Sequence, residues 1–364
     1  MHQPTKTSLF SPLTLRGVTL KNRIGVSPMC QYSAHEGLAT DWHLVHLGSR
    51  AVGGAALVMV EATAVLREGR ITPGDLGIWG EEHVAPLARI AAFVASQGAV
   101  PGIQLAHAGR KASRIPPWKG PGTLKTPEEG GWQVLGPSTL PFDESFAMPV
   151  ALDLKGIDRV VDAWEAAAKR ALEAGFKLVE IHSAHGYLLH QFLSPISNQR
   201  CDDYGGSLEN RMRLLLRVAE RVRATLPAEM PLFVRISCTD WAEGGWDIGE
   251  AVELAKRLKL LGVDLVDCSS GGTVPKPNVT MAPGYMVPFA RRIRAEAAIK
   301  TGAVGLITEP RQAEAILAAG DADLIFMGRE LLREPYFAIK AQGALGEHMH
   351  WPVQYGYVVR PPKV

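Results

Sequence analysis

Two histidines and a tyrosine stand close together in the chain, in the pattern His182-Ser-Ala-His185-Gly-Tyr187. Two imidazoles at this spacing, where a strand opens into a loop, can converge on one acceptor and donate two N–H bonds to it. Such a pair would polarise a carbonyl or nitro oxygen, and Tyr187 could deliver a proton as a general acid. The spacing also suits a zinc pair, and buried structural histidines are commoner than either arrangement. The pattern alone therefore leaves three interpretations open.

Two strand-like runs carry a polar side chain among apolar neighbours. Arg235 lies in the run 232–237 and Gln104 lies in the run 100–106. An unpaired guanidinium is costly to bury, so Arg235 must meet either an acid or an anionic ligand. Polar side chains in the strands of a filled barrel favour a polar cofactor edge that lies across the barrel mouth.

Glycines recur near the C-terminus, at Gly302, Gly305 and Gly328, and Arg329 follows the last of them. Glycine lets backbone N–H groups approach a ligand closely, and Arg329 would supply a fork-shaped countercharge. Glycine pairs are common in α/β chains, but the loops after the seventh and eighth strands are the usual phosphate site of a (β/α)8 barrel. The position of these glycines favours a phosphate cradle.

The four cysteines are far apart and include no Cys-x-x-Cys pair: Cys30, Cys201, Cys238 and Cys268. The sequence therefore encodes neither a zinc ribbon nor an iron–sulfur cluster, and reduced thiols are the simpler expectation. Cys30 follows the first strand-like run and has no acid–base partner beside it. Taken alone, such a cysteine is more often a buried small hydrophobe than a nucleophile.

Eight short apolar or β-branched runs, each followed by a segment with helical periodicity, must position these side chains. We predict strands at residues 23–28, 56–62, 100–106, 178–182, 232–237, 265–269, 301–306 and 324–327. Strands that must be covered on both faces indicate a closed parallel sheet surrounded by helices. The predicted fold class is α/β, a (β/α)8 TIM barrel. A doubly wound open sheet is the alternative, but the chain lacks both the GxGxxG turn and the P-loop that such a sheet predicts.

The apolar residues also predict the helices around this barrel. From Leu208 to Leu226 they recur at spacings of three and four, which gives one apolar stripe on a helix that faces the core. A similar face earlier in the chain ends at Gly175, a natural helix terminator.

Two proline-rich stretches, residues 110–152 and 273–288, are too long for ordinary loops. They follow the third and sixth predicted strands, so in a barrel they would form long capping loops over the face where active sites lie. Aromatic side chains in the first stretch predict that it is anchored rather than disordered: Trp118, Trp132, Phe142 and Phe146.

The chain has 364 residues and is predicted to form a single domain, residues 1–364, because barrels with insertions reach this length. It carries 39 Lys and Arg against 37 Asp and Glu, a formal net charge of +2. This balance argues against a nucleic-acid groove or a polybasic membrane anchor. No apolar run approaches the ~18–20 residues that span a membrane, and the N-terminus lacks an apolar signal core. We expect a soluble cytoplasmic protein.

Taken in order along the chain, these motifs resemble the Old Yellow Enzyme family of FMN-dependent ene-reductases. The resemblance covers nearly the whole chain and depends on the joint order of motifs at residues 20–24, 27–32, 61–63, 104–111, 182–187, 192–198, 203–211 and 328–330. Cys30 in place of a threonine, with Tyr32 two residues on, is similar to the thermophilic-like branch and to bacterial xenobiotic reductases.

The resemblance implies non-covalent FMN at the barrel mouth. It places one set of residues around the isoalloxazine ring: Ser27, Pro28, Met29, Cys30, Ala62, Gln104 and Arg235. Arg235 would lie near N1 and O2 of the flavin, where a cation stabilises the reduced form. Gly305, Gly328 and Arg329 would hold the phosphate. No metal is implied.

The resemblance also implies an NADPH dehydrogenase, or ene-reductase, with two half-reactions in one site. NADPH or NADH would pass hydride to flavin N5 and leave. An α,β-unsaturated carbonyl compound, imide or nitroalkene would then accept that hydride. His182 and His185 would bind the substrate oxygen, Tyr32 would help to hold it, and Tyr187 would protonate the second alkene carbon.

In this branch a C-terminal side chain often reaches the active site of a neighbouring subunit. In this sequence residues 354–357 occupy the corresponding region. We expect Tyr357 to take that position, in a homodimer or homotetramer.

Two other functions remain open from sequence, and a third is disfavoured. A metal-dependent barrel hydrolase would add His43, His46 or His107 to the histidine pair as zinc ligands. A storage barrel would bind flavin without oxidising NAD(P)H. A dienoyl-CoA reductase would require a clustered-cysteine iron–sulfur motif and a further dinucleotide domain, and the sequence contains neither.

Overall fold

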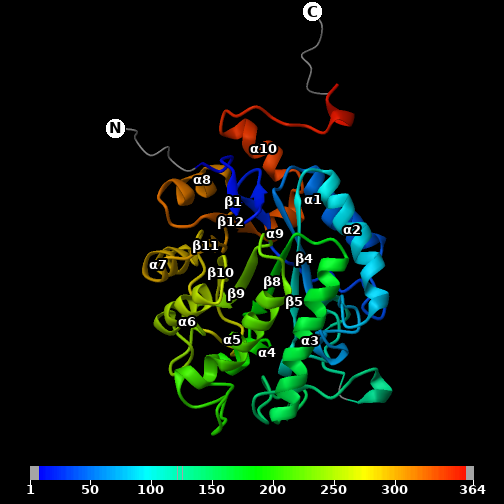
Figure 1. Cartoon of the computed structure of the whole chain (residues 1–364), viewed down its shortest axis with the longest axis vertical. Helices are drawn as coiled ribbons and strands as arrows, with labels where there is room; N and C mark the ends of the chain where they lie inside the picture. The colour runs from blue at the N-terminus through cyan, green and yellow to red at the C-terminus, as the bar shows by residue number, and fades with distance from the viewer. Residues whose placement is uncertain (1–7, 121, 125, 358–364) are drawn as a thin grey trace, which may run out of the picture.

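The computed structural model describes residues 8–120, 122–124 and 126–357. Eight strands, all paired in parallel, close into a barrel with helices around it (Figure 1). In spatial order these strands are β3 (Ile24–Val26), β4 (Leu57–Ala64), β5 (Val100–Ala106), β8 (Leu178–Ser183), β9 (Leu232–Ser237), β10 (Leu265–Ser269), β11 (Lys300–Ala303) and β12 (Leu324–Met327). The predicted (β/α)8 barrel is confirmed.

Eight helices of eight residues or more lie in the described part of the chain. They are α1 (Asp41–Val52), α2 (Val84–Ser96), α3 (Leu154–Glu173), α5 (Leu208–Thr225), α6 (Ile248–Leu260), α7 (Val287–Ala297), α8 (Pro310–Ala318) and α10 (Phe337–Ala344). Two shorter helices, α4 (Leu188–Leu193) and α9 (Arg329–Arg333), follow β8 and β12 at the carboxyl ends of those strands.

The predicted seventh strand was wrong at its carboxyl end. β11 ends at Ala303, whereas the prediction continued to residue 306. Gly305 has a φ of 111° and Leu306 a φ of 51°. Both values are far from extended backbone, so the chain leaves the sheet and forms a loop at the barrel mouth.

The helices α3 and α5 show how the sequence pattern becomes structure. In α3 the Asp153 side chain caps the first turn by accepting from Gly156 N at 2.7 Å, and the apolar stripe that includes Trp164 is fully buried. This helix ends just before Gly175, which has a φ of 85°. In α5 the Ser207 side chain accepts from Asn210 N. The two helices lie side by side, and Arg217 pairs with Asp158 across them at 2.8 Å.

The inward-facing side chains change from apolar to polar along the barrel axis. The antiparallel hairpin of β1 (Leu13–Leu15) and β2 (Val18–Leu20) closes the amino-terminal end, where it packs on buried Leu178 and Phe233. Successive inward positions on a strand are two residues apart. On β8 they run from Leu178 through Glu180 to His182, and all three are buried. The barrel interior is therefore an apolar plug at one end and a polar site at the other.

The segment between β5 and α3 covers residues 107–153 and contains the short paired strands β6 (Leu135–Gly136) and β7 (Val150–Ala151). It lies at the bottom of Figure 1, whereas β1 and α10 lie at the top. Trp132 anchors it by donating from Nε1 to Glu68 O at 2.8 Å. Trp118, by contrast, is 64% exposed and meets only the edge of the Tyr32 ring among the described aromatic pairs. The segment between β10 and α7 covers residues 270–286.

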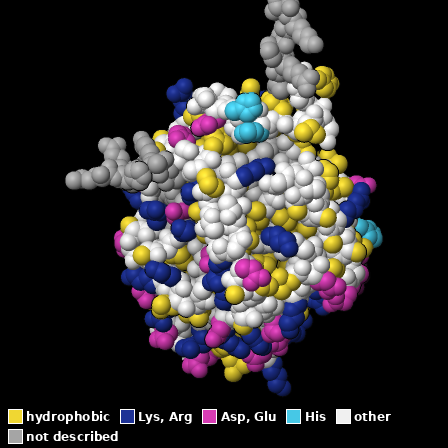
Figure 2. All heavy atoms as spheres, turned by 45° about the horizontal axis from the view of Figure 1, so that its top comes forward, with side chains coloured by type: hydrophobic (Ala, Val, Ile, Leu, Met, Phe, Trp, Pro, Cys, Tyr) yellow, Lys and Arg dark blue, Asp and Glu magenta, His cyan; other side chains and the backbone are white. Residues whose placement is uncertain are grey.

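Charged side chains of both signs are interleaved over the face of the molecule drawn in Figure 2, and hydrophobic side chains are scattered among them. No helix in the described ranges has the length and hydropathy that a membrane span requires.

Candidate active site

The side chains of His182, His185 and Tyr187 meet at the carboxyl end of β8. The ring centroids of His182 and His185 are 5.1 Å apart, and those of His182 and Tyr187 are 5.0 Å apart. Both pairs meet edge to face. The sequence pattern thus becomes a single cluster, with His182 in its centre.

The hydrogen bonds of His182 determine which ring nitrogen carries its proton. Nδ1 accepts from the backbone N–H of Ala184 at 3.2 Å, so the neutral ring is protonated on Nε2. Burial is the main cause that holds the pKa of His182 well below its usual value, and the Arg235 charge acts in the same direction. At neutral pH, His182 therefore offers one N–H donor without carrying a charge.

His185 is oriented by a serine that the sequence patterns did not single out. Its Nε2 lies 2.6 Å from Ser269 Oγ, at the end of β10. A neutral His185 that accepts from Ser269 carries its proton on Nδ1, the nitrogen left for a ligand. Burial, with Arg235 as the next cause, holds the pKa of His185 well below its usual value.

The loop that carries these residues is held by close contact with the loop after β10. His185 and Gly186 have φ values of 60° and 72°. A Cβ on Gly186 would lie 2.1 Å from the Gly272 carbonyl oxygen, so only glycine fits this approach. Lys111 Nζ joins the two loops by donating to His185 O and Gly272 O, each at 2.9 Å. The geometry of the cluster is thus fixed by backbone contacts.

A layer of buried polar side chains lies next to the histidine cluster, on the side of the amino-terminal end of the barrel. Gln104 Nε2 donates to Glu180 Oε1 at 2.8 Å, and Arg235 Nε lies 3.1 Å from Asp267 Oδ2 as an ion pair. Burial, followed by the Asp267 charge, raises the pKa of Glu180 to about 8. Burial also raises the pKa of Asp267 to about 6, against the effect of Arg235. Glu180 thus accepts from Gln104 and is also subject to the charge of Arg235.

Several buried atoms of this region have no hydrogen-bond partner among the described residues. They include Ser27 Oγ, Glu180 Oε2 and Asp267 Oδ1. Arg235 Nε and Asp267 Oδ2 make no hydrogen bond either, although they face each other as the ion pair. Buried polar groups are normally satisfied, so this set indicates a polar ligand at the barrel mouth.

Residues 27–30 lie beside the loop after β12. Ser27 N donates to Met327 O at 3.0 Å. A Cβ added to Gly328 would lie 3.6 Å from Met29 Sδ and 3.9 Å from Ser27 Cβ. Pro28 connects these two residues. The structure therefore brings the first predicted cofactor segment next to the predicted phosphate loop.

The thiol of Cys30 has a raised pKa because of burial and two nearby carboxyl groups. Burial is the largest cause that raises the pKa of its thiol, and Asp75 and Glu61 add to it, while a hydrogen bond with the Ala62 backbone opposes it. Glu61 Oε1 accepts from Gln31 N at 2.9 Å and so holds the backbone between Cys30 and Tyr32. Cys30 is therefore a neutral thiol next to Ala62.

A cavity of about 260 Å³ contains the predicted phosphate residues together with Arg235. Gly305, Gly328 and Arg329 line it, and so do Ser269, Tyr285 and Arg333. A Cβ built on Gly328 would meet no atom closer than 3.6 Å, so the backbone at this glycine is open to the cavity. Tyr285 comes from the segment between β10 and α7 and Arg333 from the end of α9, and no sequence pattern predicted either of them.

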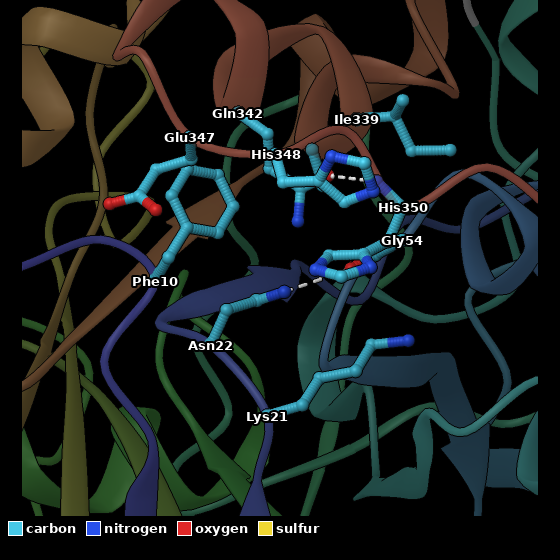
Figure 3. Close-up of a pocket in the computed structure, with 10 residues that line it drawn as sticks. Phe10, Lys21, Asn22, Gly54, Ile339, Gln342, Glu347, His348 and His350 are labelled. Carbon is cyan, nitrogen blue, oxygen red and sulfur yellow. Dashed lines mark hydrogen bonds between the residues drawn. The ribbon is translucent and has the colours of Figure 1, made fainter. Parts of the chain in front are cut away.

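A second cavity lies at the opposite end of the barrel. It has a volume of about 350 Å³ and is lined by residues that precede β3 and β4, such as Lys21 and Gly54, and by His348 and His350 (Figure 3). Because it opens at the amino-terminal ends of the strands, it is separate from the histidine cluster.

The structure also bears on the C-terminal tyrosine and on the three histidines considered as further zinc ligands. Tyr357 is 75% exposed at the end of the described chain, and its reach into a neighbouring subunit stays a prediction. His43, His46 and His107 do not join His182 and His185: the described residues contain no group of three or more potential ligands that could hold a metal ion. His43 instead accepts from Thr40 N at 3.0 Å and lies 3.8 Å from Glu61.

Comparison with known families gives a match along nearly the whole chain. The family described as NADH:flavin oxidoreductase / NADH oxidase matches residues 8–347. An NADPH dehydrogenase of Bacillus subtilis (strain 168) is 48% identical over 349 residues, which cover 95% of this chain and 98% of that protein. An NADPH dehydrogenase of Geobacillus sp. (strain WCH70) is 49% identical over 352 residues, with 96% and 98% covered.

Solved structures show the same architecture. Morphinone reductase superposes with a TM-score of 0.79 at 26% identity, over 96% of this chain and 93% of that one. An Old Yellow Enzyme homologue from Zymomonas mobilis gives a TM-score of 0.76 at 28% identity, over 98% and 97%. A 2-naphthoyl-CoA reductase gives 0.85 at 25% identity, and this chain spans about half of it (52%). The resemblance seen in the sequence motifs is confirmed.

Proposed function

Because the chain belongs to the NADH:flavin oxidoreductase / NADH oxidase family, as an Old Yellow Enzyme-type flavoenzyme that uses FMN and NADPH, we propose that it reduces activated C=C bonds. The substrates would be α,β-unsaturated carbonyl compounds, imides or nitroalkenes. The observation that carries this proposal is the cluster of two neutral histidines and a tyrosine at the barrel mouth.

The residues of the site fit FMN. Its pyrimidine edge needs polar partners, and Gln104, Arg235 and Ser27 offer buried polar groups, of which Ser27 Oγ has no partner among the described residues. Its phosphate needs a cation and open backbone, which Arg329, Gly305 and Gly328 supply in one cavity. Met29, Cys30, Pro28 and Ala62 would then flank the ring system. When bound, FMN supplies a centre that accepts hydride from NADPH and returns it to an alkene.

His182 and His185 would bind the electron-withdrawing oxygen of the substrate. In the neutral forms described above, Nε2 of His182 and Nδ1 of His185 each present an N–H. Two donors on one oxygen stabilise the negative charge that develops when the β-carbon accepts hydride.

Tyr187 would protonate the α-carbon. Burial is the main cause that raises the pKa of its phenol well above the usual value, so the hydroxyl keeps its proton until a carbanion-like centre takes it. Tyr32, whose pKa burial also raises, lines the same cavity as Tyr187 and would hold the substrate oxygen. Two substrates would use this site in turn, which predicts ping-pong kinetics.

The test is anaerobic titration of the purified holoenzyme. NADPH should bleach the flavin absorbance, and a small panel of enones and nitroalkenes should restore it. His182→Ala and His185→Ala should each retain FMN and its reduction by NADPH but slow the recovery with an enone. A protein whose flavin is reduced by NADPH but not reoxidised by any member of the panel would rule out the proposed substrates.

A further inference from the structure

A cavity of about 450 Å³ adjoins the catalytic cluster on the side of the capping segment. It is lined by Tyr32, Ile71, Thr72, Lys111, Arg114, Ile115, Pro117, Gly120, Phe146 and Tyr187. Its walls are apolar and aromatic, and its charged side chains are two cations. No aspartate or glutamate is among the lining residues.

The guanidinium of Arg114 is held in place by neutral contacts. Its Cζ lies 3.8 Å from the centroid of the Phe146 ring. Nη1 donates to Thr123 Oγ1 at 2.5 Å, and Thr123 donates in turn to Ser145 O at 2.6 Å. A stacked and tethered guanidinium loses little conformational freedom when it binds a ligand.

These hydrogen bonds of Arg114 all come from one of its three side-chain nitrogens, Nη1. Nη1 is occupied, whereas Nε and Nη2 have no hydrogen-bond or ion-pair partner among the described residues. Burial is the main cause that lowers the pKa of Arg114, and the charge of Asp143 opposes it. Asp143 is not an ion-pair partner of Arg114, and its Oδ1 accepts from Ser145 N and Ser145 Oγ at 2.7 and 2.6 Å. The N–H groups of Nε and Nη2 point in the same direction, and such a pair can donate two parallel hydrogen bonds to a carboxylate or phosphate.

Lys111 adds positive charge at the inner end of the same cavity. Its ammonium lies 5.4 Å from the Tyr187 ring centroid and 4.6 Å from that of Phe142. Burial, with the charges of Arg110 and Arg114, lowers the pKa of Lys111 to about 8. Its ammonium donates to the carbonyl oxygens of His185 and Gly272. Lys111 would therefore attract an anionic ligand by its charge without donating a hydrogen bond to it.

We propose that Arg114 is an oxyanion subsite, and that it binds a carboxylate or phosphate on the molecule that reacts beside Tyr187. The apolar walls between Tyr187 and Arg114 would accommodate the carbon skeleton. Two sources share this chemistry: an unsaturated substrate that bears a carboxylate, and the 2′-phosphate of NADPH. The inference rests on the proposed function, since it concerns a ligand of the same site.

The test compares ligands that have the proposed oxyanion with matched ligands that lack it. The first pair is para-carboxybenzylideneacetone and its methyl ester, and the second pair is NADPH and NADH. Wild type, Arg114→Gln and Arg114→Lys are compared with Lys119→Gln, which removes an exposed positive charge from the same segment outside the cavity. Steady-state kinetics give KM for each ligand, and calorimetry on the holoenzyme gives the dissociation constant of the acid independently of turnover.

If the oxyanion is a substrate carboxylate, Arg114→Gln should weaken binding of the acid by about tenfold, the loss expected for one charge-assisted pair, and leave the ester unchanged. If it is a phosphate of the reductant, the same variant should raise KM for NADPH and not for NADH. Arg114→Lys should recover part of either effect, and Lys119→Gln should show neither. Equal changes for charged and uncharged ligands, or none, would overturn the subsite. Absence of turnover of the ester by wild type would instead contradict the proposed function, and calorimetry would still test Arg114.

Discussion

His190 Nε2 lies 3.1 Å from Asp240 Oδ1, and both side chains are fully buried. His190 Nδ1 accepts from the backbone N–H of Gly186 at 2.9 Å. Since a backbone N–H can only donate, the ring proton of a neutral His190 must be on Nε2, facing Asp240. The other oxygen of Asp240 accepts from Ser194 Oγ and Trp246 N at 2.6 and 2.8 Å. Asp240 therefore selects the His190 tautomer that holds the residue before Tyr187.

Asp240→Asn should slow reoxidation of the flavin by enones about tenfold or more, the usual range for a residue that orients an active-site group. An amide nitrogen opposite Nε2 would favour the other tautomer and break the bond to Gly186, which would displace Tyr187. Rapid mixing measures each half-reaction. Reduction by NADPH should stay near the wild-type rate, and an equal slowing of both half-reactions would contradict a role limited to the Tyr187 loop.

Tyr187→Phe should remove the proton donor while leaving the ring and its contact with His182. We expect enone turnover to fall on the order of 10²-fold, with binding of the enone little changed. Product from reactions in D₂O, analysed by mass spectrometry, would show whether residual turnover still adds solvent hydrogen at the α-carbon. Undiminished rates across several enones would remove the role assigned to Tyr187.

The two catalytic histidines should not titrate in the neutral range. Burial holds the pKa of His182 and of His185 well below the usual value, so both stay neutral as the pH falls through the ordinary histidine range. The second-order rate constant for reoxidation by a neutral enone should therefore show no transition near pH ~6.5, the value of a free histidine. The prediction would be contradicted if the rate of wild type fell clearly around that pH and the rate of His182→Gln did not, because His182 would then be protonated in the neutral range.

Glu180 should make the protein less stable as the pH rises toward 8. Its folded-state pKa is raised from 4.5 to about 8, so between these values the folded protein binds more protons than the unfolded chain, and the free energy of unfolding falls with pH. Asp267 acts in the same direction only up to about pH 6. Of these two carboxyl groups, therefore, only Glu180 contributes between pH 6 and 8. Urea denaturation of Glu180→Gln should show a free energy of unfolding that falls less with pH in this interval than that of wild type, whereas Asp267→Asn should change the dependence below it.

Arg235→Gln should destabilise the apoprotein by about 3 kcal/mol, the typical cost of removing one partner from a buried ion pair. Asp267 would lose the positive charge 3.1 Å away. The variant should also bind FMN more weakly. Arg235→Lys keeps the charge and serves as the control, because it should recover stability more than FMN affinity. If Arg235→Gln were as stable as wild type, the carboxyl group of Asp267 would have to be protonated when Arg235 is absent.

Much of the fold followed from local patterns. The apolar runs predicted the barrel strands because strands covered on both faces must be apolar along their whole length, and Gly175 marked the end of α3 because it takes a left-handed φ of 85°. The end of β11 was mispredicted, since Val304 is as suitable for a strand as Ala303. The loop begins there because Gly305 and Leu306 leave the extended conformation, and only their tertiary surroundings select that path.

By itself, the sequence determined the residue types at the site: His182, His185 and Tyr187 in one motif, Arg235 and Gln104 in their strands, and the order of motifs that identifies the family. The tertiary structure decided which atoms of these residues are available. Ser269 occupies one nitrogen of His185, and Asp240 reaches the Tyr187 loop through His190. These partners are separated by tens of residues in the chain, and no local pattern records them. They meet because barrel closure brings the carboxyl ends of all eight strands to one face.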